Sequence, residues 1–347
     1  MATLQEKFRQ HYPNMLYLSQ DDPETLTAYL QHQQWIKVDE PVVSLEKPGE
    51  GNMNVVVRVI TDQQTFIVKQ ARPWVQKYPQ VEAPMQRSEV EAVFYELIAD
   101  NSVLRARTPK LIGVDAANFI IALEDMGSGS DYTHLYQADQ FITSNEITAL
   151  TDFIAQLHRI RSDQPSVKFP SNQAMKELNH EHIFRFPFME ENGFNLDDVQ
   201  PGLQEVSLIY KQHDALKQQV NRLGERYLAI GTTLLHGDYY PGSWLKTKAG
   251  ITVIDPEFAF LGDPEFDLGV MMAHLTLART EPPLIRQVLE QYKRPDSYND
   301  SLQQAYSGVE ILRRLIGLAQ LPLSLSLDEK KKLLTHATKW VLQYQGT

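Results

Sequence analysis

The sequence predicts an α+β protein with a small β-rich N-terminal lobe and a larger, mostly helical C-terminal lobe. The chain has 347 residues, which exceeds the usual size of a single hydrophobic core. Short runs of β-branched residues lie in the first third of the chain, and apolar residues at helical spacing are common in the rest. We therefore expect an N-terminal lobe over residues 1–126 and a C-terminal lobe over residues 127–347.

The N-terminal lobe is predicted to contain two helices and two pairs of strands. Asp22 and Pro23 are typical of a helix start, and a polar connection between two apolar runs indicates a hairpin. The expected ranges are 22–30 for the first helix, 54–60 and 65–69 for the hairpin, 86–99 for the second helix, and 111–114 and 119–123 for the second strand pair.

The C-terminal lobe is predicted to be helical apart from two short strands. Apolar residues recur at helical spacing over most of it, but the periodicity is weak from 164 to 231. The expected ranges are 147–157, 265–278, 301–320 and 328–345 for the helices, and 232–235 and 251–254 for the strands.

The composition excludes several classes of protein. Lys and Arg number 33 against 44 Asp and Glu, and the net charge of −11 argues against binding to nucleic acid or to an anionic membrane. Because Cys is absent, no disulfide, thiolate nucleophile or cysteine metal site can form. The N-terminus lacks the apolar core of a signal peptide, and no stretch approaches the roughly 20 apolar residues that span a bilayer. We expect a soluble, cytoplasmic protein.

Two aspartates in the C-terminal lobe lie in the motifs that indicate the chemistry of the protein most strongly. Asp238 lies in His-Gly-Asp-Tyr-Tyr-Pro-Gly-Ser at 236–243, and Asp255 follows in Ile-Asp-Pro-Glu at 254–257. Phosphoryl transfer needs one carboxylate beside the attacking hydroxyl and another that holds Mg²⁺ against the ATP phosphates. Gly-Asp and Pro-Gly are also common turn residues, so either motif alone would be ambiguous. The ordered pair is typical of a protein-kinase-like catalytic loop.

The N-terminal lobe offers matching candidates for phosphate binding. Residues 49–54 form a glycine-rich turn whose backbone N–H groups can cradle phosphates. Lys69 lies at the end of an apolar strand, as does the kinase lysine that holds the α- and β-phosphates. An ordinary hairpin turn and a solvated lysine are the alternatives for each feature taken alone. The next helix offers Glu89, Glu91 and Glu96 as ion-pair partners of Lys69, and we favour Glu91.

Two further acidic segments support these motifs. Glu124–Met126 lies where a kinase hinge would present backbone groups to adenine. Asp267 opens a helix, and we expect it to hold the catalytic loop. A first-turn acid that merely complements the helix dipole is the alternative.

The sequence resembles the aminoglycoside phosphotransferase and choline kinase superfamily, from about residue 49 to residue 320. Within it, the chain is most similar to the 5-methylthioribose kinases. The shared motifs are GNxN at 51–54, IVKQAxP at 67–73, IDPEFAF at 254–260 and LRRxxG at 312–317. Ser243 replaces the usual asparagine, as it does in that family. The resemblance implies a protein-kinase-like two-lobe fold and a phosphotransferase that uses ATP and Mg²⁺.

The resemblance also implies a role for each candidate residue. The catalytic set would be Asp238 as the base, with Lys69 and Glu91. The metal ligands would be Asp255, Glu257 and, more weakly, Ser243. The nucleotide contacts would be Gly51, Asn52, Asn54, Lys69, Glu124 and Met126. The substrate contacts would be Arg313, Arg314 and Tyr239.

The best guess for the acceptor is the 1-hydroxyl of 5-methylthioribose or of a related sugar. Two differences from that family lie near the acceptor: no Trp occurs around residues 184–189, and Tyr239-Tyr240-Pro241 replaces Leu-His-Thr. An amino alcohol, an aminoglycoside or another sugar is the alternative acceptor. Arg313 and Arg314 favour a neutral, oxygen-rich one, although a solvated helix face is the alternative for this pair.

Two functions of other classes also fit part of the sequence. A metal-dependent hydrolase could use the acidic motifs as ligands, but it would leave Lys69 and the glycine-rich turn without a purpose. A non-catalytic nucleotide-binding relative would keep the fold without the transfer. The sequence leaves open a homodimer and the choice between one and two Mg²⁺ ions.

Overall fold

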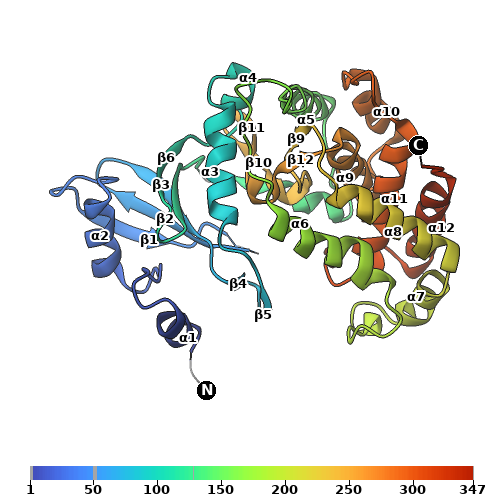
Figure 1. Ribbon diagram of the computed structural model, residues 1–347, viewed down its shortest axis with the longest axis horizontal. Coiled ribbons are helices and arrows are strands. Elements are labelled where there is room, and N and C mark those ends of the chain that lie inside the picture. The colour runs from blue at the N-terminus through green and yellow to red at the C-terminus, as the bar shows by residue number, and fades with distance from the viewer. Residues whose placement is uncertain (1–2, 50–52, 128, 347) are drawn as a thin grey trace. The chain divides into compact units, whose positions relative to one another are not determined.

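The computed structural model describes residues 3–49, 53–127 and 129–346 (Figure 1). The chain divides into two compact units, Met1–Gly127 and Ser128–Thr347, which we call the N-terminal unit and the C-terminal unit. Gly51 and Asn52, and with them half of the predicted glycine-rich turn at 49–54, lie outside the described residues. Among the residues that are described, no helix is both long and apolar enough to cross a membrane.

A five-stranded antiparallel sheet forms the centre of the N-terminal unit, in the order β1-β2-β3-β7-β6. β-branched residues are frequent in β2 and β3 because the pleated backbone accommodates side chains that branch at Cβ. In the register of β3 with β7, Lys69 lies opposite Ile121. Both predicted strand pairs are confirmed. The strands are β1 (Val42–Glu46), β2 (Val55–Thr61), β3 (Thr65–Gln70), β6 (Leu111–Asp115) and β7 (Ile120–Glu124).

Successive residues of β3 face opposite sides of this sheet, and a helix covers each side (Figure 1). Val68 packs with Leu30 of α2 (Pro23–His32) in one hydrophobic core. Lys69 points the other way and meets α3 (Arg87–Ile98). The alternation of the strand therefore places the lysine on the α3 side.

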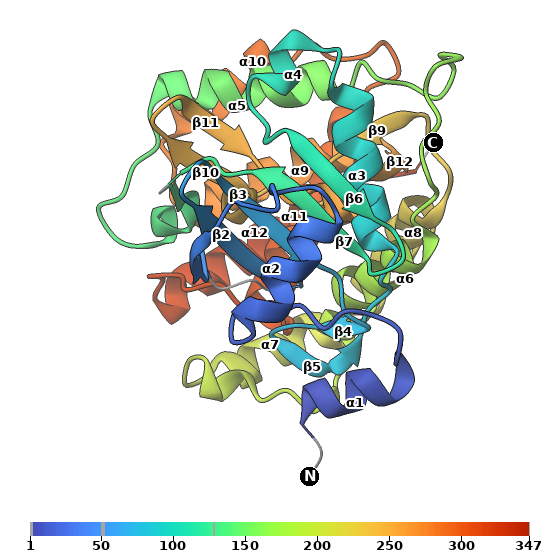
Figure 2. The same ribbon diagram turned by 90° about the vertical axis from the view of Figure 1, so that its left-hand side faces the viewer.

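The start of the chain lies beside β4 and β5 (Figure 2), and the segment after α1 supports the end of β3. Phe8 of α1 is 1% exposed, and its ring meets that of Trp74 in β4 at 6.1 Å. The side chain of Gln70 in β3 hydrogen-bonds to the backbone of Leu16 and Leu18. The sequence does not predict these elements because they are too short to show a period. They are α1 (Leu4–His11), β4 (Trp74–Val75), β5 (Tyr78–Glu82) and α4 (Ser102–Arg105).

Helices make up most of the C-terminal unit (Figure 1), and α8 (Asp214–Leu228), α9, α11 and α12 share one hydrophobic core. Nearly every residue of α9 is buried, and α11 packs against both α9 and α12. A helix that is apolar on all sides belongs at the centre of a core. All four predicted helices are confirmed. The main helices are α5 (Ser144–Leu157), α9 (Pro264–Leu277), α10 (Pro282–Gln291), α11 (Asp300–Ile316) and α12 (Leu327–Gln343).

Two small antiparallel sheets in this unit bring the acidic motifs to strand ends. β9 ends just before His236 and pairs with β12. β11 ends just before Asp255 and pairs with β10, which also pairs with β8. The strands are β8 (Ser130–Asp131), β9 (Thr233–Leu235), β10 (Trp244–Thr247), β11 (Gly250–Val253) and β12 (Phe260–Gly262).

The region from 164 to 231 folds into short helices and turns. α6 continues into a π-helical turn at Glu181–Arg185, and α8 places Val220 and Leu223 in the main core. Such interruptions break the 3.6-residue period, which explains the weak signal in the sequence. The helices are α6 (Gln173–His180), α7 (Leu203–Lys211) and α8 (Asp214–Leu228).

Glu146 joins three segments of the C-terminal unit at the start of α5. Its carboxylate accepts from Tyr132 Oη at 2.7 Å, from Lys246 Nζ at 2.9 Å and from the Thr143 backbone N–H at 2.8 Å. Thr143 caps the helix in return, which completes a capping box. Burial raises the pKa of Glu146, but these hydrogen bonds outweigh it and lower the pKa to about 2.

We expect Glu146→Gln to lower the free energy of unfolding by about 2 kcal/mol at pH 7, because an amide cannot satisfy all of these donors. The pKa is lower in the folded chain than its ordinary value of 4.5. The contribution of the Glu146 carboxylate to the free energy of unfolding is therefore fully present above about pH 4.5 and is lost as the pH falls towards 2. Urea titrations at several pH values should show the two proteins converging in acid.

Glu329→Gln is the control, because it removes the charge of the capping-box glutamate of α12 at an exposed position, where the amide oxygen can still accept from the Ser326 backbone N–H, and it should have a smaller effect. A constant difference between Glu146→Gln and the unsubstituted protein from pH 7 to pH 3 would contradict the assignment.

Candidate active site

The N-terminal unit holds a buried ion pair between Lys69 and Glu91. Lys69 Nζ lies 2.8 Å from Glu91 Oε1, and the two residues are 7% and 1% exposed. Glu91 lies on the buried face of α3, whereas Glu89 and Glu96 are exposed. A buried lysine needs a partner because an isolated charge is costly to desolvate. The pairing expected from the sequence is confirmed, and its catalytic role stays a prediction.

Arg87, which the sequence does not single out, anchors the end of the glycine-rich turn. Its side chain is fully buried at the start of α3. Nε donates to Asn54 Oδ1 at 2.9 Å, and Nη2 donates to the Met53 carbonyl at 3.0 Å. Nη1 donates to the carbonyls of Arg72 and Pro84 at 2.9 and 2.7 Å. Asn54, a predicted nucleotide contact, therefore also has a structural role in holding the turn.

The segment Glu124–Met126 is held by contacts on both sides. Asp125 forms a two-point ion pair with Arg58 of β2, at 2.9 and 3.1 Å. The Glu124 N–H donates to the Lys110 carbonyl at 2.9 Å, and the Glu124 carboxylate accepts from the Lys110 N–H at 3.2 Å. These contacts fix the end of β7, and contacts of Glu124 and Met126 with adenine stay a prediction.

Asp267 of α9 fixes the loop that carries Asp238. Its carboxylate accepts the backbone N–H groups of His236 and Gly237 at 2.6 and 2.9 Å. His236 is fully buried, and its Nε2 lies 2.9 Å from the Ile254 carbonyl, so Nε2 carries the proton. The structural role expected for Asp267 is confirmed by these contacts.

Close backbone contacts hold the second acidic motif beside the first. Gly237 has φ +81°, and a Cβ there would lie 2.1 Å from the Phe258 carbonyl oxygen, so only glycine fits. The Ile254 N–H donates to the Ser243 carbonyl at 3.0 Å. Ser243 Oγ donates to the Asp238 carbonyl at 2.8 Å. The hydroxyl of Ser243, a predicted metal ligand, therefore also braces the loop.

Asp255 has a left-handed backbone, with φ 62° and ψ 50°. This conformation costs a residue other than glycine on the order of 1 kcal/mol, and such strain concentrates at functional sites. Pro256 follows and begins a 3₁₀ turn that contains Glu257. Asp255 is half-buried and Glu257 is 4% exposed.

The assignment of Asp255 and Glu257 as ligands of a nucleotide-bound Mg²⁺ stays a prediction. In the described part of the chain, no group of three His, Asp or Glu side chains could hold a metal ion. Mg²⁺ that also binds nucleotide phosphates needs only one or two carboxylates from the protein. Asp255 and Glu257, on one short turn, match that requirement.

Asp238 is partly withdrawn from solvent and lies near two cations. Its side chain is 24% exposed, and Oδ1 lies 3.9 Å from Arg314 Nη2. Burial raises the pKa of Asp238 to about 6, and Arg314 and Arg313 oppose this rise. Such a group is mostly ionised at neutral pH yet binds a proton more readily than an ordinary aspartate. Both properties suit a proton acceptor.

Arg313 and Arg314 lie on the inner side of α11. Their side chains are 11% and 7% exposed. Glu310, one turn earlier, accepts from Arg313 Nη1 at 3.0 Å and from Arg314 Nε at 2.6 Å. The alternative of a solvated helix face is therefore wrong. Glu310 was not expected from the sequence, although its i,i+3 and i,i+4 spacing to the arginines could have indicated it.

Tyr239 faces the core of the C-terminal unit, which corrects the expectation that it contacts the substrate. It is fully buried, its hydroxyl donates to the Leu150 carbonyl at 2.8 Å, and its ring stacks on Phe153 at 6.0 Å. Tyr240 is half-buried, and its ring centroid lies 5.0 Å from Arg314 Cζ. The Tyr240 N–H donates to the Asp238 carbonyl at 3.1 Å, so the chain turns at Tyr239 and the two tyrosine rings face different surroundings.

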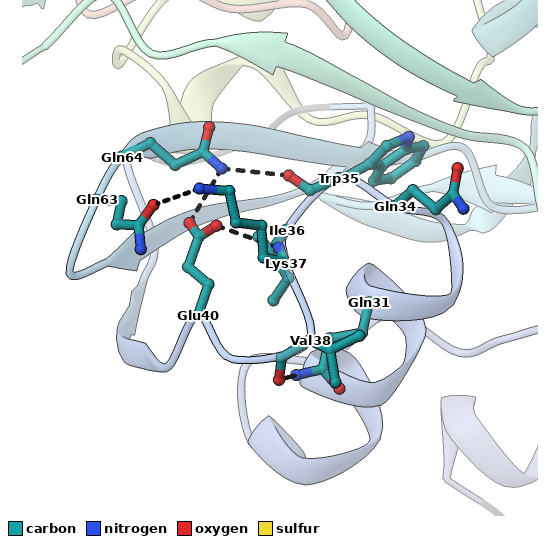
Figure 3. Close-up of a pocket in the computed structure, with 9 residues that line it drawn as sticks. All are labelled: Gln31, Gln34, Trp35, Ile36, Lys37, Val38, Glu40, Gln63 and Gln64. Carbon is teal, nitrogen blue, oxygen red and sulfur yellow. Dashed lines mark hydrogen bonds between the residues drawn. The ribbon is translucent and has the colours of Figure 1, made fainter.

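A separate hollow in the N-terminal unit is lined by both polar and apolar side chains and holds none of the predicted site residues (Figure 3). Its charged groups are bound to neighbours. Lys37 Nζ donates to Gln63 Oε1 at 3.2 Å, and Glu40 Oε1 accepts from Gln64 Nε2 at 3.0 Å and from Thr61 Oγ1 at 2.6 Å. The hollow therefore shows no acid and base poised for catalysis.

A model of the phosphotransferase enzyme family matches residues 44–306, which is well over half of the chain. The chain belongs to this family. The methylthioribose kinase of Yersinia pestis (strain Pestoides F) is 29% identical to this phosphotransferase over 253 residues, which are 69% of this chain and 60% of that protein. The methylthioribose kinase of Exiguobacterium sibiricum is 26% identical over 327 residues, which are 81% of each. The chain thus spans 60% of the length of the Yersinia relative.

The phosphotransferase also shares its fold with solved structures. The choline kinase LicA from Streptococcus pneumoniae aligns with a TM-score of 0.52 and 16% identity, covering 92% of this chain and 100% of that one. A likeness at this identity shows the fold alone. The predicted α+β, protein-kinase-like fold is confirmed.

We expect Asp267→Asn to lower the free energy of unfolding by about 2–4 kcal/mol, because the two buried N–H groups of the loop lose an ionised acceptor. Equilibrium unfolding in urea measures the loss. Asp328→Asn alters an exposed aspartate near Lys331 and should change stability by less than about 0.5 kcal/mol. Equal effects of the two substitutions would show that Asp267 does not hold the loop.

Tyr239→Phe should lower the free energy of unfolding by about 1–2 kcal/mol, since the buried Leu150 carbonyl loses its donor. The KM for the acceptor should stay unchanged, because the ring faces the core. Tyr240→Leu should instead raise that KM, since it removes the ring beside Arg314. A larger change in acceptor KM for Tyr239→Phe than for Tyr240→Leu would restore Tyr239 as a substrate contact.

Proposed function

We propose that this phosphotransferase transfers the γ-phosphoryl group of ATP to a hydroxyl of a small molecule. Our best guess for the acceptor is the 1-hydroxyl of 5-methylthioribose or of a related sugar. The family supports phosphoryl transfer, and the relatives named methylthioribose kinase support the acceptor. The observation that carries the proposal is the rigid placement of Asp238 beside Arg314.

The N-terminal unit would bind the nucleotide. Lys69 would hold the α- and β-phosphates, because its buried ammonium is oriented by the Glu91 carboxylate at 2.8 Å. Asn54 and the preceding turn at Gly51 and Asn52 would cover the phosphates. Glu124 and Met126 would contact the adenine.

The C-terminal unit would hold the metal through Asp255 and Glu257, with Ser243 as a weaker ligand. Bound Mg²⁺ would neutralise charge on the phosphate oxygens. The left-handed backbone of Asp255 and the buried turn around Glu257 fix these carboxylates in advance, so little ordering is needed on binding.

Asp238 would orient the acceptor hydroxyl and accept its proton as transfer proceeds. A pKa near 6 leaves the carboxylate ionised at pH 7 and able to take the proton. Arg313 and Arg314 would contact the oxygens of the acceptor. Two buried cations favour a neutral, oxygen-rich acceptor over a cationic amine, which supports a sugar.

Asp238→Asn should lower turnover by at least about a hundredfold, because the amide cannot accept the proton. ADP release in the presence of 5-methylthioribose, another sugar, an amino alcohol or an aminoglycoside measures turnover. Thermal stabilisation by Mg-ATP should persist in the variant, since the nucleotide contacts are unchanged. Unchanged turnover in Asp238→Asn would refute its role, and turnover with another acceptor but not with 5-methylthioribose would refute only the named acceptor.

A further inference from the structure

A chain of buried, hydrogen-bonded polar side chains leads to Arg313 and Arg314 of α11. It runs from Tyr136 through His274 and Glu310 to Arg314, residues that are 1%, 0%, 2% and 5% exposed. Tyr136 Oη lies 2.6 Å from His274 Nδ1, and His274 Nε2 lies 3.0 Å from Glu310 Oε1. Glu310 then binds Arg314 through Oε1 and Arg313 through Oε2. We call these five residues the Glu310 network.

The hydrogen bonds and the charges assign a proton to each group. Burial raises the pKa of Glu310, but Arg313, Arg314 and His274 outweigh it and hold the pKa well below its ordinary value. The carboxylate is therefore ionised and only accepts. Burial lowers the pKa of His274 to about 4, so the ring is neutral at pH 7 and has one N–H. That proton is on Nε2, because Glu310 cannot donate, and Nδ1 accepts from the Tyr136 hydroxyl.

Every donor around Glu310 therefore points at it, and Glu310 fixes both guanidinium groups in return. Arg314 uses Nε for this contact, and its Nη2 extends towards Asp238. The distance of 3.9 Å from Nη2 to Asp238 Oδ1 is longer than a charged hydrogen bond of about 2.8 Å. The ring of Tyr240 lies beside the same guanidinium, 5.1 Å from the ring of His274. Arg314 is thus turned towards Asp238 without being bonded to it.

Stability alone does not explain the network. A buried ion pair often stabilises a fold no more than apolar side chains of the same volume. Asp238 and Glu310 both attract the two arginines. If Glu310 lost its charge, Asp238 would be the carboxylate on which the guanidinium groups could close. A proton acceptor locked in such a salt bridge could not bind the acceptor hydroxyl.

We propose that Glu310 and His274 are positioning residues for the acceptor side of the reaction, an inference that rests on the proposed function. Glu310 engages both arginines and so keeps Asp238 available, while His274 and Tyr136 hold Glu310 in place. Because Arg314 Nη2 and Asp238 Oδ1 are 3.9 Å apart, a hydroxyl oxygen that lies to one side of the line joining them can be within hydrogen-bond distance, about 2.8 Å, of both. Such an oxygen accepts from Arg314 and donates to Asp238 at the same time.

Glu310→Gln tests this role, because it keeps the shape of the side chain and removes its charge. We expect kcat to fall at least about tenfold, while the Kd for Mg-ATP stays within about twofold, since the change acts on the acceptor hydroxyl. Asp300→Asn is the matched control. It alters an exposed aspartate that pairs with Arg294 at the start of the same helix, and it should leave turnover unchanged.

A double variant separates positioning from a general loss of stability. Arg314→Lys should lower kcat by itself, and adding Glu310→Gln should cause a smaller further loss than Glu310→Gln causes alone, because Glu310 acts in part through Arg314. Substitutions at two other positions of the network extend the test to variants that keep Glu310. Tyr136→Phe should lower kcat severalfold by freeing the His274 tautomer, and His274→Gln, which can still donate to Glu310, should retain more turnover than His274→Leu.

Normal turnover in Glu310→Gln, or losses that multiply in the double variant, would overturn the positioning role. If Glu310→Gln does not fold, normal turnover in both Tyr136→Phe and His274→Leu would overturn it. The absence of ADP release from the unsubstituted protein with every acceptor would instead reject the proposed function. Turnover of the unsubstituted protein therefore distinguishes the two failures.

Discussion

The hydrogen bonds from the backbone of His236 and Gly237 to Asp267 are the contacts on which the rest of the candidate site depends. They tie the loop of Asp238 to α9, a helix buried on nearly all sides, so the loop shares the rigidity of the core. Because Gly237 has no side chain, the same loop contacts the backbone of Phe258 and fixes the second acidic motif as well. A catalytic carboxylate needs such support, since a displacement of about 1 Å can cost two orders of magnitude in rate.

Both units hold the buried cations of the candidate site in a similar way. Lys69 has Glu91 as its partner, and Arg313 and Arg314 share Glu310. In each case a carboxylate on a helix binds the cation. This contact offsets the cost of burying the charge and fixes the direction of the charged group. Arg87 differs because its guanidinium binds carbonyls and one amide oxygen, and its role is to hold the backbone next to a turn.

Much of the fold could be predicted, because long elements repeat their apolar residues many times. The helices expected over 265–278 and 301–320 appear as Pro264–Leu277 and Asp300–Ile316. The pairing of Lys69 with Glu91 also followed from the sequence, since Glu91 shares a helical face with Val90 and Phe94. Arg87 lies on that face too, and its position among apolar residues was the signal for a buried arginine. The predicted roles of the site residues agree less well with the structure, because a motif identifies a residue but does not show where its side chain points.

The sequence by itself determined which residue types form the candidate site and their order along the chain: a lysine on a strand, an aspartate in a turn and a second aspartate before a proline. Only the tertiary structure decided which of two adjacent tyrosines faces the core, and it placed Tyr239 inside and Tyr240 beside Arg314. It also brought Tyr136 and His274 to Glu310. The physical reason is that local propensity and periodicity act over a few residues. The partner of a buried charge is chosen by packing between segments that lie far apart in the sequence.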